Sequence, residues 1–259
     1  MSDRIIVAID SGSQMTKAVA VRDGVMIAKA STYTDFDAEA AAKLVLEKLL
    51  ETAGLSREEV AGIIATGSNR QLVTFADDKV NEIVSAASGV HALFPDVRML
   101  LDMGAEGSRV VSMDDNGAAK SYEVNDRCAS GAGTFIETCA RALEIKPEEM
   151  TVYASQYTTE IPMKAQCVVF VESEVISLIH QKESKANIAH GVHIGISDRI
   201  GSMFRRLGVN GVSAFIGCPA KNTDLVHCME KAIGYPMVVP EDPEYIGAYG
   251  AALVMAARQ

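Results

Sequence analysis

One sequence pattern occurs twice in this chain, and the repeat limits the folds that the chain can adopt. The segment "RIIVAIDSGSQMTKAVAVRDG" starts at Arg4, and "VRMLLDMGAEGSRVVSMDDNG" starts at Val97. Each copy predicts a buried strand that ends in an aspartate, a tight glycine turn and a second strand. Aligned on the aspartates, the copies equate Asp10 with Asp102, Gly12 with Gly104, and Lys17 with Arg109. Because helical segments follow each copy, the repeat indicates an internal duplication.

The segments around the two copies alternate between helical and strand patterns. Helices are predicted at 37–54, 81–94, 186–207 and 244–259, and strands that run into glycine turns at 62–68 and 212–222. This order predicts an α/β fold of two lobes with a cleft between them. We expect the first lobe to span residues 1–95 and the second 96–259, with the last helix packing back on the first lobe.

Composition excludes several classes of function. The chain has 259 residues, 48% of them hydrophobic and 22% charged, as in an ordinary globular protein. A net charge of −10 argues against nucleic acid or an anionic membrane as a partner. The N-terminus has no signal-peptide pattern, and no apolar run approaches the roughly 18–20 residues of a membrane span, so we expect a cytoplasmic protein. Five cysteines are too few and odd in number for a disulfide scaffold.

The two aspartate-led turns have the residue types that bind a nucleotide phosphate and its magnesium ion. Glycine lets the backbone approach phosphate oxygens, and two carboxylates, Asp10 and Asp102, suit a magnesium ion that keeps most of its waters. Lys17 has the length to reach a terminal phosphate. A single aspartate of this kind is better explained as an ordinary residue that closes a hairpin turn, whereas the pair favours nucleotide binding. The hydroxyls that we expect to donate to phosphate belong to Ser11, Ser13 and Thr16.

Two cysteines stand at predicted helix starts. Cys128 lies in "NDRCASGAGTF", just before a glycine-rich turn, and Cys167 precedes a segment that is predicted to be helical over 172–179. The positive end of a helix lowers a thiol pKa and favours the thiolate, which is the form that binds metals. By spacing alone a pair 39 residues apart is a weak metal signature, and buried packing residues or zinc ligands remain alternatives.

These motifs resemble those of known ATPases. "AIDSGSQMTKAV" and "LLDMGAEGS" resemble the two phosphate hairpins of the actin/Hsp70/sugar-kinase superfamily, and "FIGCPAKN" stands where its adenosine turn is expected. "NDRCASGAGTF", "CVVFVESEVISLI" and "ATGSNR" resemble more closely the BadF/BadG/BcrA/BcrD ATPase family, which includes activators of 2-hydroxyacyl-CoA dehydratases and ATP-binding subunits of benzoyl-CoA reductase. The resemblance implies a duplicated, ribonuclease H-like two-lobed ATPase fold.

The resemblance also implies cofactors and partners. Cys128 and Cys167 would hold one [4Fe–4S] cluster jointly with a second protomer, and ATP/ADP with Mg²⁺ would drive a low-potential electron to a CoA-thioester dehydratase or reductase. Ferredoxin or flavodoxin would be the donor. The implied catalytic residues are Asp10, Asp102 and Glu106. The implied nucleotide-binding residues are Ser11, Gly12, Ser13, Gln14, Thr16, Lys17, Gly104, Ala105, Gly131, Gly133, Gly217, Cys218, Lys221 and Asn222.

The sequence departs from the family at two turns. Activators usually carry Asp-Ile-Gly-Gly-Gln-Asp at the second phosphate motif, whereas this chain has Glu106 at the glutamine position and Gly107 at the last carboxylate. Both rapid and slow hydrolysis of ATP therefore remain alternatives. The alanine that follows the glycine leaves a heterodimer with a related subunit as an alternative to a homodimer. The adenosine turn has Gly217-Cys218-Pro219 in place of Gly-Gly-Val.

A second functional hypothesis and the remaining histidines and cysteine complete the expectations from the sequence. A small-molecule kinase of the same superfamily, without a cluster, is the second functional hypothesis. The histidines show no tight ligand spacing; His190 and His193 share a helix face and are expected to be solvated. Cys228 is expected on a helix beside His227.

Overall fold

The structure is a computed structural model that describes residues 4–125, 132–163, 167–208 and 211–258. The chain forms two compact units, each described by itself below. Unit 1 comprises Met1–Val97, Met113–Lys120 and Pro240–Gln259, and unit 2 comprises Arg98–Ser112 and Ser121–Val239. Two segments that follow residue 96 in the sequence therefore belong to unit 1, which is discontinuous along the chain.

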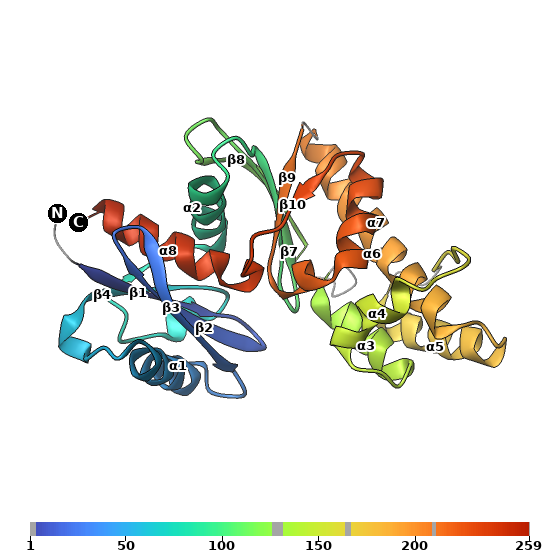
Figure 1. Cartoon of the computed structure of the whole chain (residues 1–259), viewed down its shortest axis with the longest axis horizontal. Helices are drawn as coiled ribbons and strands as arrows, with labels where there is room; N and C mark the ends of the chain where they lie inside the picture. Colours follow the sequence, from blue (N-terminus) through green and yellow to red (C-terminus); the bar gives the residue numbers. More distant parts are fainter. Residues whose placement is uncertain (1–3, 126–131, 164–166, 209–210, 259) are drawn as a thin grey trace. The chain divides into compact units, whose positions relative to one another are not determined.

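Unit 1 is built on a five-stranded sheet with the order β3-β2-β1-β4-β5 (Figure 1). The first three strands pair antiparallel, while β4 runs parallel to β1 and β5 runs parallel to β4. The central strand, β1, is apolar along most of its length because both of its faces are covered. The strands are β1 (Ile5–Ser11), β2 (Met15–Arg22), β3 (Val25–Tyr33), β4 (Val60–Thr66) and β5 (Asp78–Lys79).

Helices cover both faces of this sheet. The side chains of Val7 and Ile9 share a core with α1 (Ala38–Ala53), and the alternate side chains of Ile6 and Ala8 share another with α8 (Ile246–Arg258). Against α8 lies α2 (Glu82–Leu93). The two helices approach closely, because a methyl group at Gly250 would lie 1.8 Å from the carbonyl oxygen of Ser85.

Unit 2 repeats the sheet of unit 1. Its strand order is β10-β9-β6-β7-β8, which, counted from the β8 edge, matches the order in unit 1. The register repeats too, since Asp10 pairs with Lys17 and Asp102 pairs with Arg109. The duplication predicted from the sequence is confirmed. The strands are β6 (Met99–Met103), β7 (Ser108–Met113), β8 (Ala119–Asn125), β9 (Ser213–Ile216) and β10 (Met237–Val238).

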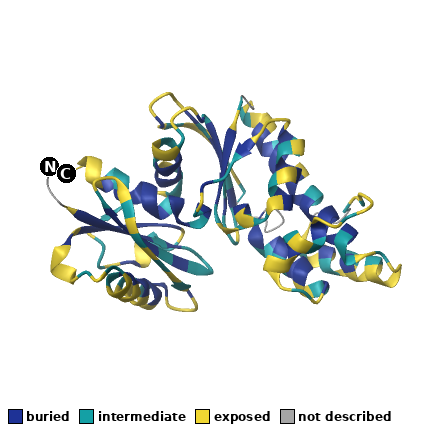
Figure 2. Cartoon of the chain, viewed as in Figure 1, coloured by how far each residue is buried: buried dark blue, intermediate teal, exposed yellow. Residues whose placement is uncertain are grey.

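The helices of unit 2 enclose a large apolar core that includes Phe135, Phe204 and Phe215. The prediction of a long helix ending at Leu207 is confirmed, and the helix that follows Cys167 starts at Val168, four residues before the predicted start. Buried residues line the strands and the inner sides of these helices (Figure 2). The helices are α3 (Gly133–Ala142), α4 (Met150–Ala154), α5 (Val168–His180), α6 (Lys185–Leu207) and α7 (Thr223–Ile233).

Short 3₁₀ turns complete the described fold. Ser56 and Glu59 form a capping box, in which the amide of Ser56 donates to the Glu59 carboxylate at 2.8 Å, at a single 3₁₀ turn that leads into β4. Among the described residues, none of the helices combines the length and the hydropathy that a membrane span requires. The 3₁₀ turns are Arg57–Glu59, Arg70–Leu72, Pro147–Glu149, Cys218–Lys221 and Pro243–Tyr245.

Candidate functional site

The first glycine turn of the repeat joins β1 to β2 in unit 1. The amide of Gly12 donates to the carbonyl oxygen of Met15 at 3.2 Å and closes the turn. Two residues from elsewhere in unit 1 hold the Gly12 carbonyl oxygen, with Asn69 Nδ2 at 3.0 Å and Thr34 Oγ1 at 2.9 Å. The amide of Asn69 also donates to the Ser11 carbonyl oxygen at 2.9 Å. Asn69 therefore fixes the turn from the "ATGSNR" segment, a role that its position in the sequence does not indicate.

Asp10 stands at the end of β1 with its carboxylate partly exposed. Lys17 Nζ lies 3.6 Å from Asp10 Oδ2 across the hairpin. Gly67 keeps space beside this carboxylate, because a Cβ at Gly67 would lie 2.5 Å from Asp10 Oδ1. On the other side, a Cβ at Gly247 would lie 3.8 Å from Asp10 Oδ2. The carboxylate is thus flanked by two residues without side chains, which suits a group that takes a hydrated ligand.

The predicted hydroxyl donors of the first turn differ in position. Ser11 and Thr16 are fully buried, and the Thr16 hydroxyl is bonded to the Thr34 hydroxyl at 3.0 Å. Thr16 is therefore part of the support of the turn in this structure. Ser13 and Gln14 are half-buried at its tip. The binding of phosphate by these four residues stays a prediction.

The second glycine turn joins β6 to β7 in unit 2 and repeats the first. The amide of Gly104 donates to the carbonyl oxygen of Gly107 at 2.8 Å. Arg109 Nη1 lies 3.3 Å from Asp102 Oδ2. This contact corresponds to the 3.6 Å contact between Lys17 Nζ and Asp10 Oδ2 in unit 1. Glu106 is exposed at the tip of the turn, where its carboxylate is accessible to water.

The start of α3 packs directly on this second turn. The amide of Gly133 donates to the Gly104 carbonyl oxygen at 2.9 Å. Thr134 donates twice to the Ala105 carbonyl oxygen, from its amide at 2.9 Å and from its hydroxyl at 2.6 Å. The helix that follows the Cys128 motif therefore starts on the predicted phosphate turn. Cys128 and Gly131 lie outside the described residues.

The predicted adenosine turn meets the same region of unit 2. Gly217 has φ 96° and ψ 165°, a conformation that only glycine adopts readily. A Cβ there would lie 2.1 Å from the carbonyl oxygen of Met103, the last residue of β6. Cys218 is exposed, and Pro219 lies next to the start of α3, since a Cβ at Gly133 would be 3.5 Å from Pro219 Cγ. Three predicted nucleotide motifs thus converge at the end of β6.

Lys221 and Asn222 follow this turn. Lys221 is exposed. Asn222 has a structural role, because its side chain accepts from the amide of Leu225 at 3.1 Å and caps α7. The Asn222 side-chain amide also contacts His193 Nε2 at 2.9 Å. Contact of Lys221 and Asn222 with a nucleotide stays a prediction.

Cys167 is exposed at the N-cap of α5, with no cap hydrogen bond from its side chain. Two exposed apolar side chains follow it, Val169 at 73% and Phe170 at 67% exposure. By contrast, Cys139 is buried in α3. Burial, assisted by the nearby charges of Glu174 and Glu172, raises the pKa of the Cys139 thiol to about 12. Among these two cysteines, only Cys167 presents a thiol at the surface.

The expectation of solvated histidines on α6 is wrong. His190 and His193 are fully buried, and both rings contact the carboxylate of Asp224 on α7. Cys228 is also buried, and its described sulfur contacts are His190 and Asp224. Asp224 and Cys228 are four positions apart on α7, and this spacing is the sequence signal that places them on one face of the helix.

These features define a class of protein. Two units with one sheet topology, each carrying an aspartate-led glycine turn, form a duplicated α/β fold of the actin/Hsp70/sugar-kinase type. Residues 7–255 match the BadF/BadG/BcrA/BcrD ATPase family. The chain belongs to that family.

Individual relatives resemble the chain over most of its length. It is 34% identical over 245 residues to the activator of lactoyl-CoA dehydratase from Anaerotignum propionicum, covering 95% of each chain. It is 31% identical over 212 residues to one of the subunits of benzoyl-CoA reductase from Thauera aromatica, covering 79% of this chain and 74% of that one. The solved structure of the activator of the 2-hydroxyisocaproyl-CoA dehydratase from Clostridium difficile, with bound ADPNP, superposes with a TM-score of 0.94 at 30% identity, covering 98% of this chain and 95% of that chain.

Proposed function

We propose that this protein is an ATP-dependent, iron–sulfur-bearing activator that passes low-potential electrons to a CoA-thioester dehydratase or reductase. The observation that carries the proposal is the exposed Cys167 at the start of α5. It stands in a chain whose relatives include named activators of CoA dehydratases.

The surroundings of Cys167 fit a cluster ligand. The first turn of α5 provides partial positive charge, which favours a thiolate and offsets the negative charge of a thiolate-ligated cluster. One chain has too few suitable cysteines, because a [4Fe–4S] cluster takes four thiolates. We propose that Cys128 and Cys167 hold it together with the same two cysteines of a second copy, or with those of a related subunit. The exposed Val169 and Phe170 beside Cys167 would be covered in such a pair. When bound, the cluster supplies one-electron transfer.

The two glycine turns fit the nucleotide. We propose that Asp10 and Asp102 bind the hydrated Mg²⁺ of ATP, and that the backbone at Gly12 and Gly104 approaches its phosphates. Glu106, exposed at the second turn, is proposed to orient the water that attacks the γ-phosphorus, releasing ADP and phosphate. The support for this assignment is the repeated geometry of the two aspartates and the match to an ATPase family.

The free energy needed to lower the cluster potential supports a coupling between nucleotide binding and electron transfer. Lowering a one-electron potential by about 200–300 mV requires roughly 5–7 kcal/mol. One hydrogen bond near a cluster contributes about 1 kcal/mol, which is too little. A nucleotide that binds two conformations unequally supplies the difference. One electron from reduced ferredoxin or flavodoxin would leave to the acceptor enzyme, and hydrolysis of ATP would restore the starting conformation.

The test uses protein purified without oxygen. We expect iron and sulfide at four of each per two chains and a cluster potential that shifts between ADP and ATP. Cys167→Ser and Cys128→Ser should each abolish the iron, while Cys139→Ser, which removes a buried thiol of α3, should keep it. Cluster content that survives Cys167→Ser, or a colourless wild-type protein that hydrolyses ATP normally, would contradict the proposal.

A further inference from the structure

A second group of metal-ligating side chains lies inside unit 2. His190 on α6, and Asp224 and Cys228 on α7, are each less than a tenth exposed. His190 Nδ1 lies 3.0 Å from both Asp224 oxygens, and Cys228 Sγ lies 3.8 Å from His190 Nδ1 and 3.9 Å from Asp224 Oδ2. One ligand atom from each of the three residues thus lies within 4.8 Å of the others.

The backbone places the three ligands on facing surfaces. Residues four apart on a helix share a face, so Asp224 and Cys228 both project from one side of α7. The helices α6 and α7 pack closely against each other. In tetrahedral zinc sites, bonds of about 2.0–2.3 Å separate the ligand atoms by roughly 3.3–3.6 Å. The observed separations of 3.0, 3.8 and 3.9 Å bracket that range.

The second layer of contacts resembles that of a metal site as well. Ligating carboxylates and imidazoles are normally held by further hydrogen bonds that fix their orientation. His193 Nδ1 contacts Asp224 Oδ2 at 2.6 Å, and the side-chain amide of Asn222 donates to His193 Nε2 at 2.9 Å. This pair of bonds sets the tautomer of His193, which donates from Nδ1 to Asp224. Burial lowers the pKa of the His193 ring.

The outer nitrogen of His190 provides an independent observation. His190 Nε2 is buried and has no hydrogen-bond partner among the described residues. The nearest carboxylate oxygen, Glu160 Oε1, is 3.9 Å away. The ring is fixed by stacking on Tyr157, with centroids 3.6 Å apart and 8° between the planes. If Nδ1 binds a metal, the proton must sit on Nε2, and Glu160 Oε1 at 3.9 Å is the carboxylate on that side of the ring.

We propose that His190 Nδ1, an Asp224 oxygen and Cys228 Sγ form a binding site for one Zn²⁺ ion, separate from Cys128 and Cys167. Binding breaks the S–H bond of Cys228 and forms a zinc–thiolate bond, so one proton is released to solvent. The proton of His190 moves from Nδ1 to Nε2 and stays on the ring. Three protein ligands leave the fourth position to a water molecule.

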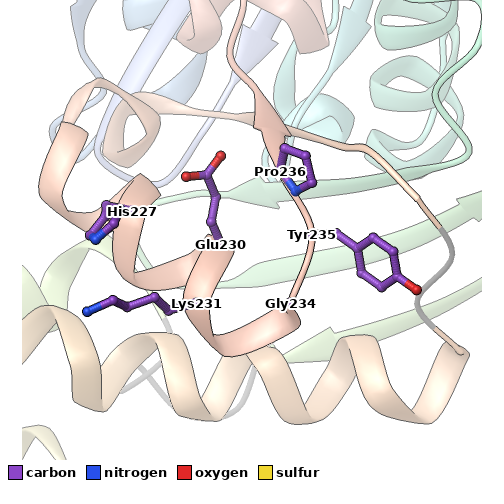
Figure 3. Close-up of a pocket in the computed structure, with 6 residues that line it drawn as sticks. All are labelled: His227, Glu230, Lys231, Gly234, Tyr235 and Pro236. Carbon is purple, nitrogen blue, oxygen red and sulfur yellow. The ribbon is translucent and has the colours of Figure 1, made fainter.

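A surface pocket lies on α7, the helix that carries Asp224 and Cys228. Its lining includes His227, Glu230, Lys231 and Tyr235, on α7 and the segment after it (Figure 3). Lys231 Nζ is 3.2 Å from Glu160 Oε1, the same atom that faces His190 Nε2. Lys231 and Glu160 are therefore the charged side chains that lie between the pocket lining and the outer edge of the His190 ring.

The experiment measures metal binding by the full-length chain. Protein purified without oxygen is treated with a chelator that spares the iron and then titrated with Zn²⁺, and with Co²⁺ as a coloured probe. We expect one Zn²⁺ per chain, release of one proton per ion, and a sulfur-to-cobalt absorption band from a single thiolate. X-ray absorption at the zinc edge should report one sulfur and two or three lighter ligand atoms.

Variants separate this site from the cluster cysteines. Cys228→Ser and Asp224→Asn should reduce zinc content at least tenfold, whereas Cys139→Ser, another buried thiol of unit 2, should leave it unchanged. X-ray absorption on the wild-type protein does not depend on whether these variants fold. Zinc with four sulfur neighbours would place the ion at Cys128 and Cys167 and overturn the proposal, and so would a wild-type protein that binds no zinc.

Discussion

Arg109 Nη1 lies 3.3 Å from Asp102 Oδ2 across the hairpin of β6 and β7. Lys17 and Asp10 repeat this relationship across β1 and β2, at 3.6 Å. In each unit a cation is paired with the carboxylate that we assign to magnesium. Such a pair neutralises the aspartate when no metal is bound, and it places a positive charge next to the proposed position of the phosphates.

Asp10→Asn and Asp102→Asn should each lower the ATP hydrolysis rate by at least about a hundredfold. An amide binds Mg²⁺ more weakly than a carboxylate, and a positioned metal contributes several kcal/mol to phosphoryl transfer. Steady-state phosphate release measures the effect. Glu47→Gln, an exposed change on α1, is the matched loss of one charge and should leave the rate within twofold. Wild-type rates in both aspartate variants would remove the two turns from the proposed site.

Gly217→Ala should strongly destabilise the protein. Its backbone conformation is nearly exclusive to glycine, and the new Cβ would lie 2.1 Å from the Met103 carbonyl oxygen. We expect a loss of more than about 4 kcal/mol, or failure to fold. Gly234→Ala is the control, because Gly234 also has positive φ but open space around it, so it should cost only about 1–2 kcal/mol. Denaturant unfolding compares the two, and equal losses would show that the close approach is unimportant.

Asn69→Ala should weaken ATP binding more than it weakens the fold. The variant loses the bond from Asn69 Nδ2 to the Gly12 carbonyl oxygen, which is worth about 0.5–1.5 kcal/mol. Because that bond holds the first phosphate turn, we expect KM for ATP to rise roughly three- to tenfold. Asn116→Ala, in an exposed turn of unit 1, should change neither KM nor the unfolding midpoint. A KM unchanged in Asn69→Ala would mean that the turn keeps its shape without this contact.

Cys139 should resist alkylation that modifies Cys167. With a pKa of about 12, only about one Cys139 thiol in ten thousand is ionised at pH 8, and the side chain is buried. Cluster-free protein treated with iodoacetamide and analysed by peptide mass spectrometry should carry the label on Cys167 and not on Cys139. Protein with an intact cluster should be protected at Cys167. Rapid labelling of Cys139 would indicate that α3 opens, and labelling of Cys167 in iron-replete protein would argue against its role as a ligand.

The sequence predicted the features of the fold that repeat. The apolar run before Asp10 recurs before Asp102, and this periodicity alone predicted two hairpins, whose register the structure confirms. The long helix ending at Leu207 could also be predicted, because its helical pattern extends over many residues and Gly208 follows its last residue.

Contacts between distant segments could not be predicted in the same way. His190 and Asp224 are 34 positions apart, and only the packing of α6 on α7 brings them together. The histidine pattern on α6 is equally typical of an exposed helix face, so nothing in the sequence indicates that these rings are buried. Asn69 is a similar case, since its partner Gly12 is 57 positions away.

The last helix has a consequence for how the protein is made. Tyr249 and Met255 of α8 complete the core on one face of the β1 sheet, and the Tyr249 hydroxyl donates to the Gly24 carbonyl oxygen at 2.8 Å. A ribosome releases residues 4–97 long before it releases this helix. During synthesis, the earliest strands therefore expose one apolar face until α8 has been made, and a nascent chain truncated before residue 246 lacks the element that shields it.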